Sequence, residues 1–252
     1  MRNIFTIVRR ELKVYFFSPL AYVILAGFSA IMGWMFYALL TRYVSQLQQY
    51  TGLHMGKAMT LQEGLIRPLF GNMNLLLLFL VPFITMRLLS EERRNGTLVL
   101  LMTTPVSVIE IVLGKFFSAL ALVGVALAIT LTYPAILMYL GHPDLGAILM
   151  NYLGTVLMVS CYAAVGIFFS AVTENQIVAG FLSLGTNLLF WLISWVDPTS
   201  KMGDICSYLS LITHYDRFGE GVLDLKDLVY LLSFVVVWLV FTHRVVESHR
   251  WK

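Results

Sequence analysis

The stretch FFSALALVGVALAITLTYPAILMYL, residues 116–140, contains no Asp, Glu, Lys or Arg. A helix needs about 20 predominantly apolar residues to cross the hydrocarbon core of a bilayer, so this stretch is long enough to span it. The stretch is continuously apolar, without the alternation that is typical of barrel strands. The sequence therefore predicts an all-α integral membrane protein with six transmembrane helices in a single domain, residues 1–252. The other five apolar windows are about residues 20–40, 69–86, 147–169, 177–196 and 228–243.

The composition agrees with this fold class. Hydrophobic residues make up 59% and charged residues only 12% of the 252-residue chain, whose mean hydropathy is +0.81. Soluble domains carry about 25% charged residues, so a cytosolic enzyme and a disordered chain are excluded. The net charge of +3 is too small to indicate a nucleic-acid partner. Cys161 and Cys206 lie in different segments and predict neither a disulfide nor a metal site.

Basic residues are distributed unevenly between the two sides of the predicted membrane domain. One side carries 11 of the 17 Lys and Arg residues and the other side carries 6. By the positive-inside rule the richer side, which holds both termini, faces the cytoplasm. The first apolar run exceeds the roughly 7–15 residues of a signal-peptide core, so no cleavage is predicted. The richer side comprises residues 1–19, 87–115, 170–176 and 242–252.

The segment before the first span predicts an amphipathic helix over Ile4–Tyr15. Its apolar residues share one arc at 100° per residue, whereas Thr6, Arg9, Arg10 and Lys13 share the opposite arc. Glu11 is an exception among the apolar residues. Such a helix lies in the membrane interface with its basic residues at the headgroups. It can also contact a cytoplasmic partner, and the two interpretations are compatible.

Residues 87–107, RLLSEERRNGTLVLLMTTPVS, begin with charge and then become apolar over Thr97–Met102 without being long enough to span. Ser107 and Glu110 form a capping-box pattern that begins the next helix. The segment predicts a short helix that docks another protein at the cytoplasmic face, because exposed apolar residues mark interaction sites. The alternative interpretation is an ordinary solvated loop.

Two further segments carry local patterns. Thr173 and Gln176 have the spacing of a capping box at the start of the fifth span. On the opposite side of the membrane, residues 204–218 have apolar side chains on one helical face and polar side chains on the other. They predict one amphipathic helix that does not span the membrane and can be re-entrant. His214 lies near Asp216 in that helix, and we interpret it as a surface histidine rather than as half of a catalytic pair.

The sequence lacks the motifs of an enzyme. It contains no nucleotide-binding P-loop, no nucleophile elbow and no zinc-protease motif. The six windows also lack the ionisable residues that proton-coupled carriers place in the membrane. We therefore expect no catalytic residue and no metal site in this chain. We also expect that a partner protein supplies the energy for transport. The uncharged polar residues of the spans are expected to form interhelical hydrogen bonds, and three of them can line a translocation path: Asn72, Asn74 and Asn187.

Several motifs resemble those of a known family. EERRNGTL (residues 91–98), TPVS (104–107) and IVLGK (111–115) resemble the coupling segment of ABC type-2 exporter permeases. RELK (10–13) and YFFSPLAY (15–22) are similar to the gliding-motility-type branch, as is the loop around Tyr208-Leu209-Ser210 and His214. Val99 departs from the pattern, since many relatives have an acidic residue there.

This resemblance implies a permease with an elbow helix, a coupling helix and an outer re-entrant helix in a bacterial inner membrane. It implies two cytoplasmic ABC ATPase subunits, which bind ATP and Mg, while this chain binds no cofactor. It further implies a second permease subunit, membrane lipid contacts and, in the gliding-type branch, an auxiliary membrane protein with an outer domain. The expected ATPase interface is Glu91, Glu92, Arg93, Arg94, Gly96 and Thr97, and the expected elbow contacts are Arg9, Arg10, Glu11 and Lys13.

Three functions remain as hypotheses at this point. The first is an ATP-driven export permease, and its substrate does not follow from the sequence. The second is a membrane component that transmits ATPase motion to an outer partner without transport. The third is a membrane-embedded enzyme, which the missing motifs disfavour.

Overall fold

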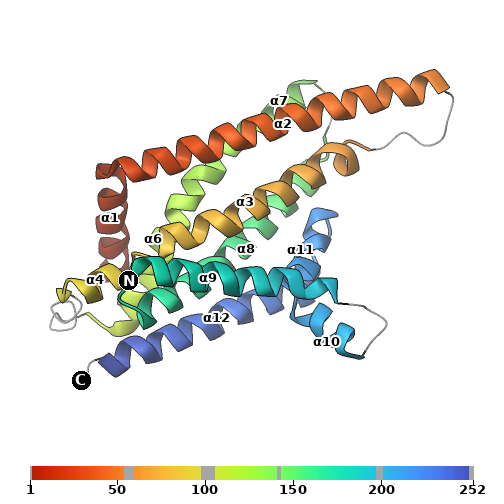
Figure 1. Ribbon diagram of the computed structural model, residues 1–252. Helices are drawn as coiled ribbons and strands as arrows, with labels where there is room; N and C mark the ends of the chain where they lie inside the picture. The colour runs from red at the N-terminus through yellow and green to blue at the C-terminus, as the bar shows by residue number, and fades with distance from the viewer. Residues whose placement is uncertain (1, 54–59, 98–105, 141–142, 197–200, 250–252) are drawn as a thin grey trace.

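A computed structural model describes residues 2–53, 60–97, 106–140, 143–196 and 201–249 (Figure 1). Within these ranges the regular structure is entirely helical. The elements are α1 (Arg2–Phe17), α2 (Pro19–Leu53), the π-helix η1 (Gln62–Ile66), α3 (Arg67–Thr85), α4 (Ser90–Arg94), α6 (Val108–Thr130), α7 (Thr132–Leu140), α8 (Leu145–Val172), α9 (Gln176–Leu192), the 3₁₀-helix η2 (Ile193–Trp195), α10 (Lys201–Leu209), α11 (Leu211–Gly219) and α12 (Leu225–Ser248).

Among the described residues, six helical segments are long and apolar enough to cross a membrane. Each overlaps one of the six windows found in the sequence, so the predicted fold class is confirmed. Most segments extend beyond their windows at one end or both, because the helices continue past the uncharged residues. They are Ala21–Gln48, Gln62–Arg94, Val108–Tyr139, Leu145–Val172, Gln176–Trp195 and Leu225–Ser248.

Helix α8 forms the centre of the bundle. It packs against α3, α6, α9, α11 and α12, and most of its residues are buried. In contrast, α2, α9 and α12 are buried over only a small part of their length. They expose large apolar side chains such as Trp34, Phe181 and Val236. Lipid tails or a partner subunit can cover such surfaces, whereas water cannot solvate them favourably.

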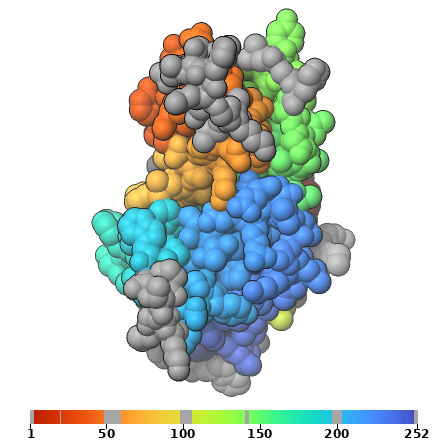
Figure 2. Space-filling view, turned by 90° about the vertical axis from the view of Figure 1, so that its right-hand side faces the viewer, coloured from red at the N-terminus to blue at the C-terminus, as the bar shows by residue number. Residues whose placement is uncertain are grey.

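The two ends of the bundle carry different elements. Helix α1 lies across one end, transverse to the long helices, together with α4 and the last turns of α12 (Figure 1). We call this the α1 end, and both chain termini lie there. Helices α10 and α11 lie at the opposite end, which we call the α11 end. Figure 2 shows the α11 end face-on, with the blue surface of α10 and α11 beside the ends of α2 and α3.

Local sequence signals explain most helix ends. Ser107 and Glu110 form the predicted capping box at the start of α6. The capping box predicted from Thr173 and Gln176 is wrong. Asn175 is the N-cap of α9, and its side-chain oxygen accepts hydrogen bonds from the backbone N–H groups of Ile177 and Val178. Asn is as good an N-cap as Thr or better, so the nearer residue is used.

The third span, Val108–Tyr139, consists of two consecutive helices that are separated at Leu131. Helix α6 ends at Thr130, and α7 begins at Thr132. Pro134 has no N–H with which to continue the α6 hydrogen-bond ladder, which explains the break.

The single helix predicted over residues 204–218 is also wrong, because Ser210 has extended backbone angles and separates α10 from α11. Two carbonyls at the end of α10 are bonded by side chains from elsewhere. The Tyr230 hydroxyl donates to the Leu209 carbonyl over 2.8 Å, and the Nε2 of His214 lies 2.9 Å from the Tyr208 carbonyl. Orphan carbonyls at a helix end are thereby satisfied without a further helical turn.

Candidate functional site

A buried cluster of three ionised side chains lies at the α1 end. The Lys115 ammonium, on α6, donates to Glu11 Oε1 on α1 over 2.9 Å and to Glu92 Oε1 on α4 over 2.6 Å. The two carboxylates lie 104 and 23 residues away from the lysine in the sequence. We call these three residues the inner cluster. It joins three helices that are separate in the chain.

The close approach of α1 to α6 depends on a glycine beside the inner cluster. A Cβ atom at Gly114 would lie 2.8 Å from two atoms of the Ile7 side chain. No side chain can be placed there without moving α1, so Gly114 lets α1 pack closely on α6. The same geometry brings Glu11 to Lys115. The exception noted in the sequence, an acid among the apolar residues of α1, is therefore explained by its buried counter-ion.

The inner cluster has two carboxyl groups but one amino group, and the Lys115 side chain is only 3% exposed. Within the described part of the chain, Glu92 Oε2 has no hydrogen-bond partner. Burying charge is costly, and it is tolerated here because each carboxylate is paired with the same ammonium. Loss of one member of such a set leaves an uncompensated buried charge.

Further contacts fix the end of α3 against α1. The Tyr15 hydroxyl donates to the Ile84 carbonyl over 2.9 Å, and the Arg87 guanidinium lies 4.1 Å from the centre of the Tyr15 ring. Burial raises the pKa of the Tyr15 hydroxyl, so it stays protonated and can donate.

Helix α4 is in turn attached to α8. The backbone N–H groups of Leu89 and Ser90 donate to Ser170 Oγ, which donates to the Met86 carbonyl. The Arg93 guanidinium donates to the carbonyls of Ala171 and Val172, each over 2.7 Å, and reaches Glu174 at 3.3 Å. Together with the inner cluster, these bonds connect α4 to α1, α6 and α8.

The structure divides the predicted interface residues into two groups. Glu91, Arg94, Gly96 and Thr97 are exposed at the α1 end. Glu92 is 9% exposed and is bound to Lys115 within the chain. Arg93 is also bonded within the chain, to the carbonyls of Ala171 and Val172 and to Glu174. Contact of these residues with an ATPase stays a prediction, and residues 98–105, including Val99 and most of the predicted apolar turn, lie outside the described residues.

Gly96 has a clear conformational role. Its φ angle is +69°, in the left-handed region where glycine is favoured. No atom lies within 4 Å of where its Cβ would be. Within the described part of the chain the glycine is therefore required by the backbone turn rather than by a close neighbour.

A polar cavity of about 220 Å³ opens beside the inner cluster, between α1 and α4. Acids and bases line it in equal numbers: Arg10, Glu11, Arg87, Glu91, Glu92 and Lys115. Of the elbow residues, Arg9, Arg10 and Lys13 are exposed, whereas Glu11 is buried in the inner cluster.

The three asparagines proposed for a translocation path are placed differently from one another. Asn74 donates to Thr155 Oγ1 over 3.2 Å and so links α3 to α8. Asn187 donates to the Tyr162 carbonyl over 3.5 Å and links α9 to α8. Both are buried, whereas Asn72 is half-buried. The expected interhelical bonds are thus present for two of them, and a role of any in translocation stays a prediction.

A second polar cluster, with a buried pair of His214 and Asp227 at its centre, lies at the α11 end, where the sequence interpretation of His214 is wrong. His214 is 4% exposed, and its Nδ1 lies 2.6 Å from Asp227 Oδ1 on α12. The Tyr230 ring stacks on the imidazole at 3.9 Å. Arg217 pairs with Asp224 and lies 3.6 Å from Asp227 Oδ2. We call His214, Arg217, Asp224 and Asp227 the outer cluster.

The partner of His214 is thus Asp227, not the nearby Asp216. Asp227 lies in the first turn of α12, and its one signal in the sequence is an acidic residue at the start of an apolar span. The pairing itself depends on the fold of α11 back onto α12. Across the ranges that the structure describes, no group of three or more His, Cys, Asp or Glu could hold a metal ion.

Comparison with known proteins identifies the family. The family model described as ABC-2 family transporter protein matches residues 6–245, which extend from α1 into α12. No curated protein matches the chain. The match and the six apolar helices among the described residues together show that the chain is a multi-pass membrane protein. The matched family further shows that it is a permease component of an ABC transporter. The chain belongs to the ABC-2 family of transporter proteins.

Proposed function

We propose that this chain is the permease subunit of an ATP-driven exporter and that separate ATPase subunits bind at the α1 end. The supporting observation is the inner cluster, which ties the exposed turn at Glu91–Thr97 to α1 and α6. The bonds from Ser170 and Arg93 tie the same turn to α8, the central helix. A movement imposed on the turn is therefore passed to the middle of the bundle.

The exposed residues of the turn are the proposed ATPase contacts. Glu91 and Arg94 offer one charge of each sign to the solvent at the α1 end, next to Gly96 and Thr97. Buried Glu92 and half-buried Arg93 hold the turn in place and do not themselves need to touch the partner. Closure of two ATPase subunits on ATP and Mg shifts the two attached permeases as rigid bodies and opens a route between them. Each ATP-bound state favours one arrangement only through differential contacts.

The proposed orientation places the α1 end in the cytoplasm of a bacterial inner membrane. The excess of basic residues in the segments at that end supports it. Cysteine introduced at Asn95 should react with an impermeant reagent only after the membrane is opened, and cysteine at Glu220 should react in intact cells. Both positions are exposed. Labelling of Asn95→Cys in intact cells would overturn the orientation.

The coupling proposal is tested by charge reversal at the exposed turn. Arg94→Glu and Glu91→Lys should leave the chain inserted and folded but reduce copurification of the ATPase and substrate-stimulated ATP hydrolysis in liposomes. Arg42→Glu is the matched control, since Arg42 is an exposed arginine on α2, away from the α1 end. Full association of both turn variants with the ATPase would contradict the proposal. Coupled hydrolysis without movement of any cargo would support force transmission to an outer partner, as in the gliding-type branch with its auxiliary protein.

A further inference from the structure

The outer face of α1 carries basic residues without acidic partners. Glu11 is the one acid of the α1 sequence, and its carboxylate is bound to Lys115 inside the protein. Within the described residues, Arg9, Arg10 and Lys13 form no ion pair with an acid. Helix α1 thus presents three exposed basic side chains at the α1 end.

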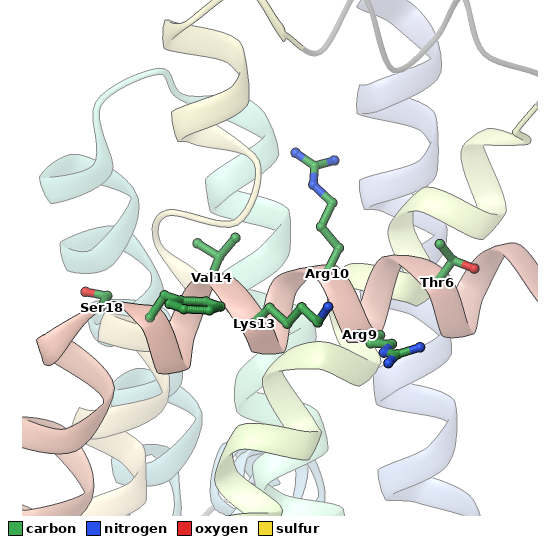
Figure 3. Close-up of a pocket in the computed structure, with 7 residues that line it drawn as sticks. Thr6, Arg9, Arg10, Lys13, Val14 and Ser18 are labelled. Carbon is green, nitrogen blue, oxygen red and sulfur yellow. The ribbon is translucent and has the colours of Figure 1, made fainter.

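These three cations point in two directions. Figure 3 shows Arg10 rising from α1 on one side, with Val14. Arg10 also lines the polar cavity beside the inner cluster. Arg9 and Lys13 lie together along a different side of the helix, one turn apart (Figure 3). Arg10 is therefore placed toward the α4 turn, whereas Arg9 and Lys13 are not.

Arg9 and Lys13 line two concavities. The first, of about 720 Å³, is also lined by Thr6, Arg10 and Ser18 and by the apolar side chains Val14 and Phe17. The second, of about 620 Å³, shares Arg9 and Lys13 but is otherwise lined by apolar and aromatic side chains. These are Phe5, Val8, Leu12, Phe16, Phe17 and Tyr22.

The apolar concavity is open to the surroundings. Phe5 is 70% exposed and Phe17 is 88% exposed, although both are large apolar side chains. Tyr22, at the start of α2, is also exposed. An aromatic surface that continues into a transmembrane helix lies at the depth of lipid chains, and cations at its border lie at the depth of headgroups.

We propose that Arg9 and Lys13 bind the phosphate of an anionic phospholipid whose acyl chains lie against Phe5, Phe17 and Tyr22. The positive charge of the pair favours a headgroup with net negative charge over a zwitterionic one. The apolar concavity beside it favours a lipid over a free phosphate. The inference rests on the membrane fold of the chain and does not depend on the proposed ATPase coupling.

The test measures lipid retention by the purified full chain. Protein in detergent is mixed with phosphatidylglycerol or with phosphatidylcholine, and the retained lipid is counted by native mass spectrometry. Wild type should retain phosphatidylglycerol preferentially, and Arg9→Gln with Lys13→Gln should lower its retention roughly 10- to 30-fold. The double variant should retain phosphatidylcholine as well as wild type does. Because both side chains are exposed, its thermal unfolding without added lipid should match that of wild type.

Matched controls make the assignment specific. Arg94→Gln, in the exposed turn at the same end, and Arg42→Gln, on α2, should keep the retention of phosphatidylglycerol, because neither arginine lines the two concavities. Inorganic phosphate at millimolar concentration should not displace the lipid. Equal loss in the control variants would reduce the effect to general charge and overturn the site. Equal retention of the two lipids by wild type, or displacement by inorganic phosphate, would equally overturn it.

Discussion

The inner and outer clusters each contain a buried pair with a carboxyl group, but they connect very different parts of the chain. The inner cluster joins residues that are 104 and 23 positions apart, on three helices. The outer cluster joins residues only 13 and 7 positions apart, on α11 and the start of α12. The inner cluster therefore holds the bundle together across the sequence, whereas the outer cluster fixes one local turn. Only the inner cluster is placed to transmit movement between remote helices.

The two clusters also differ in how they tolerate loss of a partner. In the inner cluster, both carboxylates depend on one ammonium. In the outer cluster, the imidazole can be neutral and still donate from one nitrogen. The consequences of mutation should therefore be larger at the α1 end.

The largest effect is expected for Lys115→Met. The variant keeps the volume of the side chain but leaves Glu11 and Glu92 buried without a counter-ion. Breaking a buried ionic set in this way costs about 3–5 kcal/mol of folding free energy. We expect a large fall in the midpoint of thermal unfolding in detergent. The midpoint is measured by size-exclusion chromatography of protein heated to a series of temperatures.

A triple variant sharpens this prediction. Glu11→Leu, Glu92→Leu and Lys115→Met together remove all three charges, and an apolar replacement of a buried ionic set is often neutral or stabilising. The triple variant should recover much of the lost stability. Unfolding of Lys115→Met at the wild-type temperature would show that the inner cluster does not stabilise the bundle.

The difference between the clusters also shows what the sequence could reveal. The six spans were predictable because apolar composition is a local property that each window carries by itself. The misfit of Glu11 on α1 is visible in the sequence, but Lys115 stands out only as a basic residue of the cytoplasmic side and of the motif IVLGK. Its partners could not be found, because a separation of 104 residues leaves no periodic signal. The break at Ser210 was hidden for a similar reason, since the groups that bond the end of α10 come from His214 and Tyr230.

The next effect is expected for Asp227→Leu at the α11 end. It removes the acceptor of His214 Nδ1, while Nε2 can still donate to the Tyr208 carbonyl. An unpaired buried nitrogen costs about 1–3 kcal/mol, which is less than two stranded carboxylates. The unfolding midpoint should fall less than in Lys115→Met. A fall of the same size or larger would contradict the proposed order of the two clusters.

Packing beneath the outer cluster offers a steric test without any change of charge. A Cβ at Gly154 on α8 would lie 2.7 Å from Phe218 Cβ and 3.1 Å from the Tyr215 ring. Gly154→Ala should push α11 away from α8, with a cost of about 1–3 kcal/mol from overpacking. Gly124→Ala on α6 is the control, because nothing lies within 4 Å of its Cβ position. Cysteine placed in α11 should become more reactive in Gly154→Ala and not in the control, and equal reactivity would show that α11 does not depend on this contact.

The smallest effect is expected for Arg67→Gln, which removes an exposed ion pair at the α11 end. Arg67 lies 3.3 Å from Glu220, and the two side chains are 44% and 54% exposed. Exposed pairs contribute about 0–1 kcal/mol, so the unfolding midpoint at neutral pH should change little.

Burial raises the pKa of Asp216, and the positive charge of Arg67 opposes that rise. A carboxyl whose pKa is raised by folding favours the folded state in acid, and this contribution is lost as the pH rises through the folded pKa. Without Arg67 that loss is larger, so the small difference between variant and wild type should be seen near neutral pH and vanish in acid, where Asp216 is protonated. Unfolding midpoints measured across this pH range check the sign, and a difference that grows in acid would contradict the assigned role of Arg67.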